Sequence, residues 1–141
     1  MFDILDISAS GMTAQRVRLD VISNNIANVN TTRTSEGGPY QRERVIFQER
    51  RDNKSFNDYL RDSKPAGVKV VAIKKDNAPF KIVYDPSHPD ADLEGYVRFP
   101  NVNIVTEMVD MISALRGYEA NATAIDAAKS MVSKALEIAK I

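Results

Sequence analysis

The chain has 141 residues, a net charge of zero at pH 7 and no cysteine. This length fits one ordinary domain, the balanced charge gives no electrostatic case for nucleic-acid binding, and the lack of thiols excludes disulfides and cysteine-based metal sites. The longest aliphatic run, Val70 to Ile73, is far shorter than the ~20 residues of a transmembrane helix.

Residues 1–30 are predicted to form an amphipathic helix. Its apolar seam follows a seven-residue repeat and takes in Leu5, Met12, Leu19, Ile22 and Ile26. Ser8, Gly11 and Gln15 dilute this seam, so we expect a weaker helix than the C-terminal one. The acidic first turn, with Asp3 and Asp6, disfavours a membrane-surface role. No basic segment precedes these residues, so we expect no cleavable secretion signal.

Four asparagines, Asn24, Asn25, Asn28 and Asn30, follow the last turn of this pattern. Asparagine tolerates the left-handed conformation and competes for backbone hydrogen bonds, so the helix is predicted to end here. Four amides exceed what a helix stop requires. They form either a capping cluster or a set of side chains that bond neighbouring helices.

Residues 31–40 are predicted to form a turn-rich linker. Its motif consists of Thr32, Arg33, Thr34, Glu36, Gly37, Gly38, Pro39 and Tyr40. The glycine pair is not a phosphate-binding loop, because the GxxxxGK[ST] pattern is missing and no helical pattern follows.

Between residues 41 and 100 the apolar period changes to two, which predicts about four short strands in a small antiparallel sheet. The first strand lies within residues 42–50, the second starts near Val68, the third takes in Ile82 and Tyr84, and Tyr96 to Phe99 forms the fourth. The polar, apolar-poor segment 51–66 is predicted to be a mobile loop.

Residues 101–141 are predicted to form a long helix, with Asn101 and Asn103 as candidate N-caps. The seam advances by alternate steps of four and three, as in a coiled coil, through Ile104, Met108, Met111, Leu115, Tyr118, Ala122, Ile125, Lys129, Val132, Leu136 and Ala139. A helix of roughly 38 residues spans about 57 Å, more than the ~30–40 Å of a compact domain this size. The seam must therefore be buried against something outside a single globule. Gly117 is either a tolerated irregularity or a point where another backbone approaches closely.

Two charged groups invite a functional interpretation. His88, with Asp85, Asp92 and Glu94 nearby, imitates a cation site, but its spacing matches no EF-hand loop or zinc-binding helix, and a solvated acidic loop is favoured. An enzyme would have to rest on this histidine, and we expect neither a catalytic nor a cofactor site. Early in the β region, Arg33, Arg42, Arg44, Arg50 and Arg51 alternate with Glu36, Glu43, Glu49 and Asp52. They form either a mixed-charge surface or a subunit contact.

Three segments resemble one protein family. Val21–Thr31 resembles the N-terminal signature shared by bacterial flagellar rod, hook and hook-associated proteins, Glu107–Asn121 is similar to their C-terminal helix, and Thr32–Tyr40 resembles the linker of a proximal rod subunit. The resemblance implies an α+β fold in which both terminal helices line the inner tube of an assembly, with a small β domain between them. It implies a structural subunit of the periplasmic basal-body rod, exported by the flagellar type III apparatus. Partners would be other rod subunits and the adaptor to the export gate and MS ring.

The predicted mechanism is polymerisation through the terminal helices, because each seam is larger than its own chain can cover. We expect the termini to be loose in the monomer and to order on assembly. A self-contained cytoplasmic coiled-coil adaptor is the alternative, and high, concentration-dependent helicity of the dilute chain would favour it. The predicted assembly interface comprises Leu5, Met12, Leu19, Ile22, Asn24, Asn25, Ile26, Asn28, Ile104, Met108, Met111, Leu115, Arg116, Tyr118, Glu119, Asn121, Ile125, Val132 and Leu136.

Overall fold

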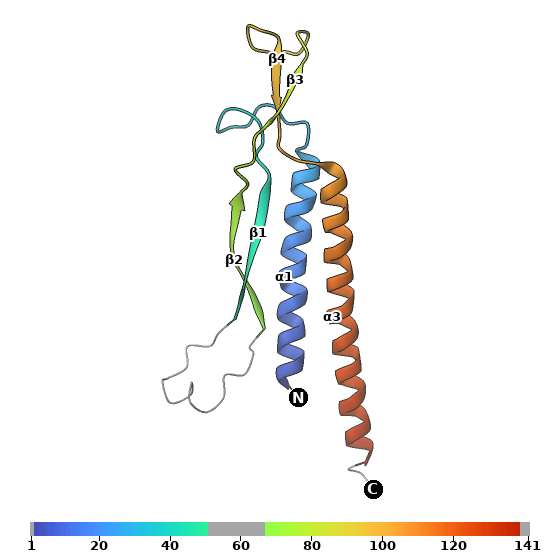
Figure 1. Cartoon of the computed structure of the whole chain (residues 1–141). Coiled ribbons are helices and arrows are strands. Elements are labelled where there is room, and N and C mark those ends of the chain that lie inside the picture. Colours follow the sequence, from blue (N-terminus) through green and yellow to red (C-terminus); the bar gives the residue numbers. More distant parts are fainter. Residues whose placement is uncertain (1, 51–66, 139–141) are drawn as a thin grey trace, which may run out of the picture.

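The computed structural model describes residues 2–50 and 67–138 of the chain. Two long helices, α1 and α3, enclose four short strands in sequence, which confirms the α+β class (Figure 1). The elements in chain order are α1 (Phe2–Ala27), β1 (Glu43–Glu49), β2 (Val68–Lys75), β3 (Lys81–Tyr84), β4 (Tyr96–Phe99) and α3 (Ile104–Ile138). The segment predicted to be a mobile loop, 51–66, lies outside the described residues.

The molecule is elongated (Figure 1). Helices α1 and α3 lie side by side and antiparallel, so both chain ends lie at one end of the molecule. Strands β1 and β2 pack along α1, and the β3–β4 hairpin projects beyond the other end of the helix pair (Figure 1). With 26 and 35 residues, the helices are about 39 and 52 Å long.

The four strands form two separate antiparallel ribbons, β1–β2 and β3–β4, instead of the single sheet predicted. The segment between β2 and β3 explains the separation. Pro79 lacks the N–H that a continued ladder needs, and the carbonyls of Asp76 and Ala78 accept hydrogen bonds from the Asn101 side chain, at 2.9 and 3.0 Å. Backbone groups that would extend the first ribbon are therefore used elsewhere.

The start of α3 is capped by Asn103. Its Oδ1 accepts hydrogen bonds from the backbone N–H groups of Val105 and Thr106, at 3.0 and 3.3 Å. These donors have no partner within the helix, and an asparagine oxygen satisfies them. Of the two cap candidates, Asn103 is therefore the cap, and Asn101 ties Arg42, the residue before β1, to the segment after β2.

The apolar core is small. In the helix pair the buried apolar residues are Ala14, Val21, Ile22, Ala114 and Ala128, and Val97 is buried in β4. The chain exposes 10376 Å², whereas a compact monomer of 15.7 kDa exposes about 7,300 Å². Along the described helices, none has both the length and the apolarity to cross a membrane.

Candidate functional site

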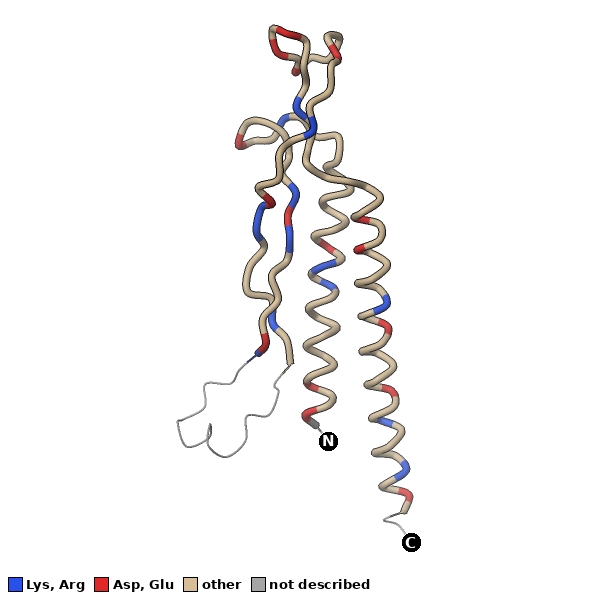
Figure 2. The backbone as a smooth tube through the Cα atoms, in the orientation of Figure 1, with Lys and Arg blue, Asp and Glu red and all other residues tan. Residues whose placement is uncertain are grey.

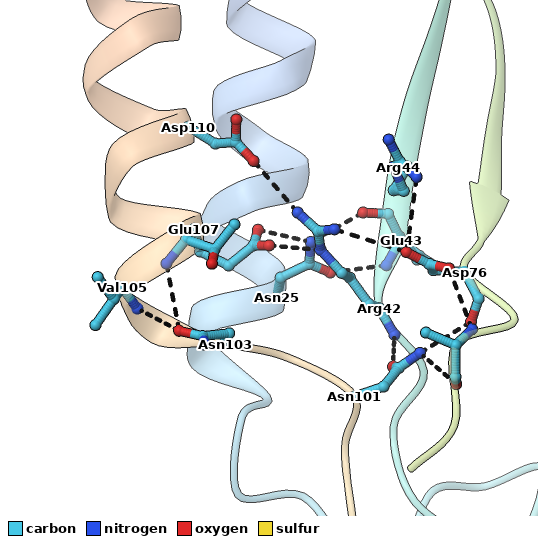
Figure 3. Close-up of polar contacts among 12 residues, drawn as sticks. Asn25, Arg42, Glu43, Arg44, Asp76, Asn101, Asn103, Val105, Glu107 and Asp110 are labelled. Carbon is cyan, nitrogen blue, oxygen red and sulfur yellow. Dashed lines mark hydrogen bonds and ion pairs between the residues drawn. The ribbon is translucent and has the colours of Figure 1, made fainter. Parts of the chain in front are cut away.

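Asn25 joins three elements at a polar junction near the end of α1 (Figure 3). Its amide nitrogen donates to the Glu43 carbonyl at 2.9 Å and to Glu107 Oε2 at 3.0 Å. Its amide oxygen accepts from the Glu43 N–H and from the Tyr40 hydroxyl, both at 2.9 Å. Both donors and both acceptor positions of the side chain are thus satisfied. Asn25 is 1% exposed, so this amide fixes β1 and α3 against α1 within one chain.

Arg42 and Glu107 form the ionic centre of the same junction. Arg42 Nε donates to Glu107 Oε1 at 2.6 Å, and the side chain of Glu107 is 1% exposed. The guanidinium also reaches Asp110 Oδ2 at 3.3 Å and Asp76 Oδ2 at 3.6 Å. Arg18 of α1 binds the other oxygen of Asp110 at 3.0 Å. A buried carboxylate is tolerated only when it is paired and hydrogen-bonded, and Glu107 meets both conditions.

The junction also changes the chemistry of Tyr40. Burial raises the pKa of this phenol to about 12, with further contributions from the negative charges of Glu43 and Glu107. Tyr40 therefore stays protonated to a higher pH than an exposed phenol does, and it donates a hydrogen bond to Asn25. The Arg42 N–H donates to Asn101 Oδ1 at 2.8 Å, so the segment that enters α3 belongs to the same network.

Further along the helix pair, each helix places a glycine opposite an amide of the other. A Cβ on Gly11 would lie 2.8 Å from Asn121 Oδ1, and one on Gly117 would lie 3.1 Å from Gln15 Nε2. The group that approaches Gly117 closely is therefore a side chain and not a backbone. Gln15 Oε1 is buried and has no hydrogen-bond partner within the described residues. These contacts fix the register of the two helices, because a shifted pairing would place a Cβ against an amide.

The predicted seam of α3 coincides with the observed contact along one row only. Met111, Tyr118, Ile125 and Val132 are half-buried. The second row that contacts α1 consists of buried or half-buried residues, namely Glu107, Ala114, Asn121 and Ala128. Each of them comes one position before a residue of the second predicted row, which begins at Met108. Small side chains and satisfied polar pairs let the two helices approach along this row. Helix α3 is therefore rotated about its axis relative to the predicted seam. The other predicted row is exposed at Met108, Leu115, Lys129 and Leu136 and half-buried only at Ala122. Ile104, at the start of the first row, is exposed as well.

An apolar strip therefore lies open on the first three turns of α3. We call it the outer strip, and it consists of Ile104, Val105, Met108, Val109, Ile112 and Leu115, each at least 44% exposed. Below it the same side of the helix carries polar residues, among them Arg116, Glu119, Thr123 and Ser130, all exposed. Monomeric soluble proteins rarely expose contiguous apolar patches of this kind. The outer strip is a candidate contact surface.

On α1 the predicted interface residues divide between two roles. Ile22 and Asn25 are buried, whereas Leu5, Met12, Leu19 and Ile26 are half-buried. Asn28 donates to the Asn24 carbonyl through both its N–H, at 3.1 Å, and its side-chain amide, at 2.9 Å. The side-chain bond from Asn28 satisfies a carbonyl of the last helical turn, and Asn25 bonds neighbouring elements, so both interpretations of the asparagine cluster hold for different members.

The linker contacts both ribbons of its own chain. Arg33 and Thr32 bind Asp90 in the loop of the β3–β4 hairpin, at 2.5 and 2.7 Å. Glu36 pairs with Lys75 of β2 at 2.6 Å, and this pair lowers the pKa of Glu36 and raises that of Lys75. The linker's turn contains two glycines with positive φ, Gly37 and Gly38, at 85° and 80°, a conformation that residues with a Cβ rarely adopt.

His88 has a local structural role. Its Nδ1 accepts the N–H of Asp90 at 3.1 Å, and its ring lies edge-on to Phe99, with 5.9 Å between centroids. In the described part of the chain, no three His, Asp or Glu side chains converge as a metal site would require. The contacts of His88 therefore stabilise the loop of the β3–β4 hairpin.

Comparison with known proteins places both helices in one family. A family model described as "Flagella basal body rod protein" matches residues 5–33, and one described as "Flagellar basal body rod FlgEFG protein C-terminal" matches residues 93–138. The flagellar basal-body rod protein FlgC of Borreliella burgdorferi is 52% identical over 98% of this chain and 97% of its own length. The chain belongs to the FlgC family of rod proteins. FlgC of Bacillus subtilis is 49% identical over 99% of this chain and 98% of its own length. FlgC of Salmonella typhimurium is 38% identical over 98% of this chain and 97% of its own length.

The chain is thus a structural rod subunit of the flagellar basal body, as the resemblance implied. The junction connects the two matched segments, because Arg18 and Asn25 lie in the first, and Glu107 and Asp110 lie in the second. Arg42 lies between them in sequence.

Sequence reasoning missed the ionic centre of the junction. Arg42 was left between a mixed-charge surface and a subunit contact, and Glu107 entered only as the first residue of the segment that resembles the C-terminal helix. Arg42 and Glu107 are 65 positions apart in the sequence. The apolar periodicity of a helix or strand covers only neighbouring residues and cannot predict such a pair. The available signal was Glu107 itself: it lies in line with Met111 and Ala114, on the side of α3 that contacts α1.

Proposed function

We propose that this subunit belongs to the proximal part of the rod and polymerises through its terminal helices into a shaft that transmits torque. Family membership supports the role as a rod subunit. The outer strip supports polymerisation, because α3 carries apolar side chains that α1 does not cover, including Met108 and Ile112 at 54% and 53% exposure.

The energetics favour burial of the outer strip by neighbours. Covering a large apolar side chain gains about 1.5–3 kcal/mol, so six such residues gain on the order of 10 kcal/mol as an upper bound. The internal core, by contrast, is largely alanine and valine. We therefore expect the helix pair to be marginal in the monomer and to become fully ordered when copies or homologues cover α3.

The predicted interface residues take two positions in this proposal. Met111, Tyr118, Asn121, Ile125 and Val132 lie toward α1 and set the geometry of the helix pair. Ile104, Met108, Leu115, Arg116 and Glu119 lie outward and meet neighbouring subunits. The outer strip meets a different surface of the next copy, and such a heterologous contact generates a helical tube when its rotation does not close.

The polar junction gives the subunit its stiffness. Asn25, Arg42 and Glu107 tie the helix pair to the first ribbon through contacts of 2.6 to 3.0 Å. Close-packed and fully hydrogen-bonded contacts resist shear. A torque applied to the helices is thereby passed to the β region without a hinge between them.

We also propose where this subunit works and with what. It lies in the periplasmic part of the basal body and is exported by the flagellar type III apparatus. Its partners are the other proximal and distal rod subunits and the adaptor to the export gate and MS ring. Its role is structural and not catalytic, so His88→Ala is expected to leave motility unchanged.

The test replaces apolar residues of the outer strip with charge. The variant Met108→Asp/Ile112→Asp is produced in a motile bacterium whose own corresponding gene has been removed, and basal bodies are purified and probed for the subunit. We expect loss of the subunit from basal bodies and loss of motility. The matched control, Thr123→Asp, lies further along α3 on the same, polar part of the outward side and is expected to assemble. Normal incorporation of the double variant would refute the proposal.

A further inference from the structure

The β3–β4 hairpin ends in an acidic tip. Residues 84–96 contain four carboxylates and no lysine or arginine, and Figure 2 shows red acidic segments on the loops at this end of the molecule. Asp90 is paired with Arg33 of the linker. Asp85, Asp92 and Glu94 make no ion pair within the described residues, so they leave uncompensated negative charge on the tip.

The tip also presents an apolar side chain between two of these charges. Leu93 is fully exposed and lies between Asp92 and Glu94. The backbone holds this arrangement, because Asp92 Oδ1 accepts the N–H groups of Glu94 and Tyr96, each at 2.9 Å. Gly95 adopts a φ of 84°, and a Cβ there would lie 2.9 Å from the Tyr84 ring. The tip is therefore a built turn that displays one leucine with a carboxylate on each side.

The first ribbon carries the opposite pattern on its outer face. Arg44 of β1 stands directly opposite Lys74 of β2, and cross-strand neighbours on one face with like charge repel each other. Among the described residues, Arg44 pairs with Asp76 alone, at 3.8 Å, and Lys74 makes no ion pair. Ile46, two residues along β1 on the same face, is 42% exposed. This face therefore displays one isoleucine beside two cations.

We propose that the acidic tip of one copy docks on the outer face of the β1–β2 ribbon of a second copy. Leu93 covers Ile46, and the carboxylates of Asp92 and Glu94 lie against Arg44 and Lys74. The inference rests on the proposed function, because it names a lateral contact within the same rod. An apolar centre with a charged rim of opposite sign is the usual composition of a specific interface.

The shape of the molecule makes this a contact between copies. The tip lies at one end of the long axis, and the ribbon runs along the side of α1 (Figure 1). One chain cannot bring its own tip to its own ribbon. A second copy displaced along the axis brings a tip beside a ribbon, and because the two surfaces differ, the contact repeats from copy to copy.

The test uses the natural absence of cysteine from the chain. Copies with Glu94→Cys and copies with Lys74→Cys, carrying tags of different size, are produced together in the gene-replaced bacterium. Purified basal bodies are treated with a short bis-maleimide cross-linker. We expect a dimer that contains one copy of each variant, and no dimer when either variant is present alone. A matched pair, Lys74→Cys with Glu137→Cys at the far end of α3, is expected to give none.

The outcomes separate the two proposals. If basal bodies contain both variants but no tip–ribbon dimer, or if Glu94→Cys alone forms dimers, the docking is overturned and the rod function stands. If the subunit is absent from basal bodies altogether, both fall.

Charge reversal gives an independent readout. Glu94→Lys and Lys74→Glu are each expected to lower incorporation several-fold, because one attractive pair becomes repulsive while Asp92, which holds the turn, is left in place. Both changes in one chain should restore incorporation. If the double variant assembles no better than the two single variants, the two charges do not face each other and the proposal is wrong.

Discussion

The junction predicts that Glu107→Ala strongly destabilises the helix pair. Glu107 binds Arg42 at 2.6 Å and Asn25 at 3.0 Å and is 1% exposed. Removing one partner of a buried ion pair costs about 3–5 kcal/mol, because the other charge stays buried. Arg42 is 19% exposed and keeps Asp110 and Asp76 nearby, so we expect the lower end, about 3 kcal/mol.

A double-mutant cycle tests the origin of that cost. Glu107→Met/Arg42→Met removes both charges, and we expect it to cost about 1–2 kcal/mol, less than Glu107→Ala alone, because apolar replacements of a buried pair are often neutral and only one N–H of Asn25 loses its acceptor. The control pair is Lys134–Glu137, which is 2.8 Å apart but 75% and 61% exposed. Glu137→Ala is therefore expected to cost less than about 0.5 kcal/mol.

The assay is urea unfolding followed by circular dichroism at helical wavelengths. Trimethylamine N-oxide is added so that a marginal helix pair has a folded baseline. If Glu107→Ala costs no more than Glu137→Ala, or if the double variant costs the sum of the single ones, the junction does not act as a coupled pair.

Three further predictions concern the helix pair, the junction and the monomer. Gly11→Ala should destabilise by about 1 kcal/mol despite better helix propensity, because its Cβ meets Asn121, and Asn121→Ala added to it should restore the urea midpoint. Tyr40 has a folded pKa of about 12, above the ~10 of an exposed phenol, so the folded state holds a proton that the unfolded state loses. Stability should fall as pH rises from about 10 to 12, and Tyr40→Phe should flatten that decline in a pH series of thermal melts. The dilute chain without osmolyte should have low helicity that does not rise with concentration, whereas a self-contained coiled-coil adaptor would show the opposite.

Local patterns predicted the elements well. Heptad spacing located both helices, Asn103 marked a helix start, and alternation located all four strands, because each of these signals is confined to a few neighbouring residues. Asn25 was included among the predicted assembly-interface residues, since an amide cluster exceeding the needs of a helix stop was visible in the sequence. The hydrogen bonds of its side chain in the structure lie within one chain.

Long-range geometry was not predictable in the same way. The division of the strands into two ribbons depends on Asn101 capturing carbonyls 23 to 25 residues away. The rotation of α3 depends on Gly11, which gives Asn121 room that a Cβ would fill. Apolar content alone favoured Met108 and Leu115 for the inner seam, yet both are exposed. Packing against a small-residue surface decided which of two adjacent rows faces inward.

A density map of intact basal bodies that contain this chain tests the central claim most directly. The account predicts that neighbouring subunits cover the outer strip, with Met108 and Ile112 buried between helices of different chains. A map in which the subunit occupies the rod while those side chains face solvent would contradict it.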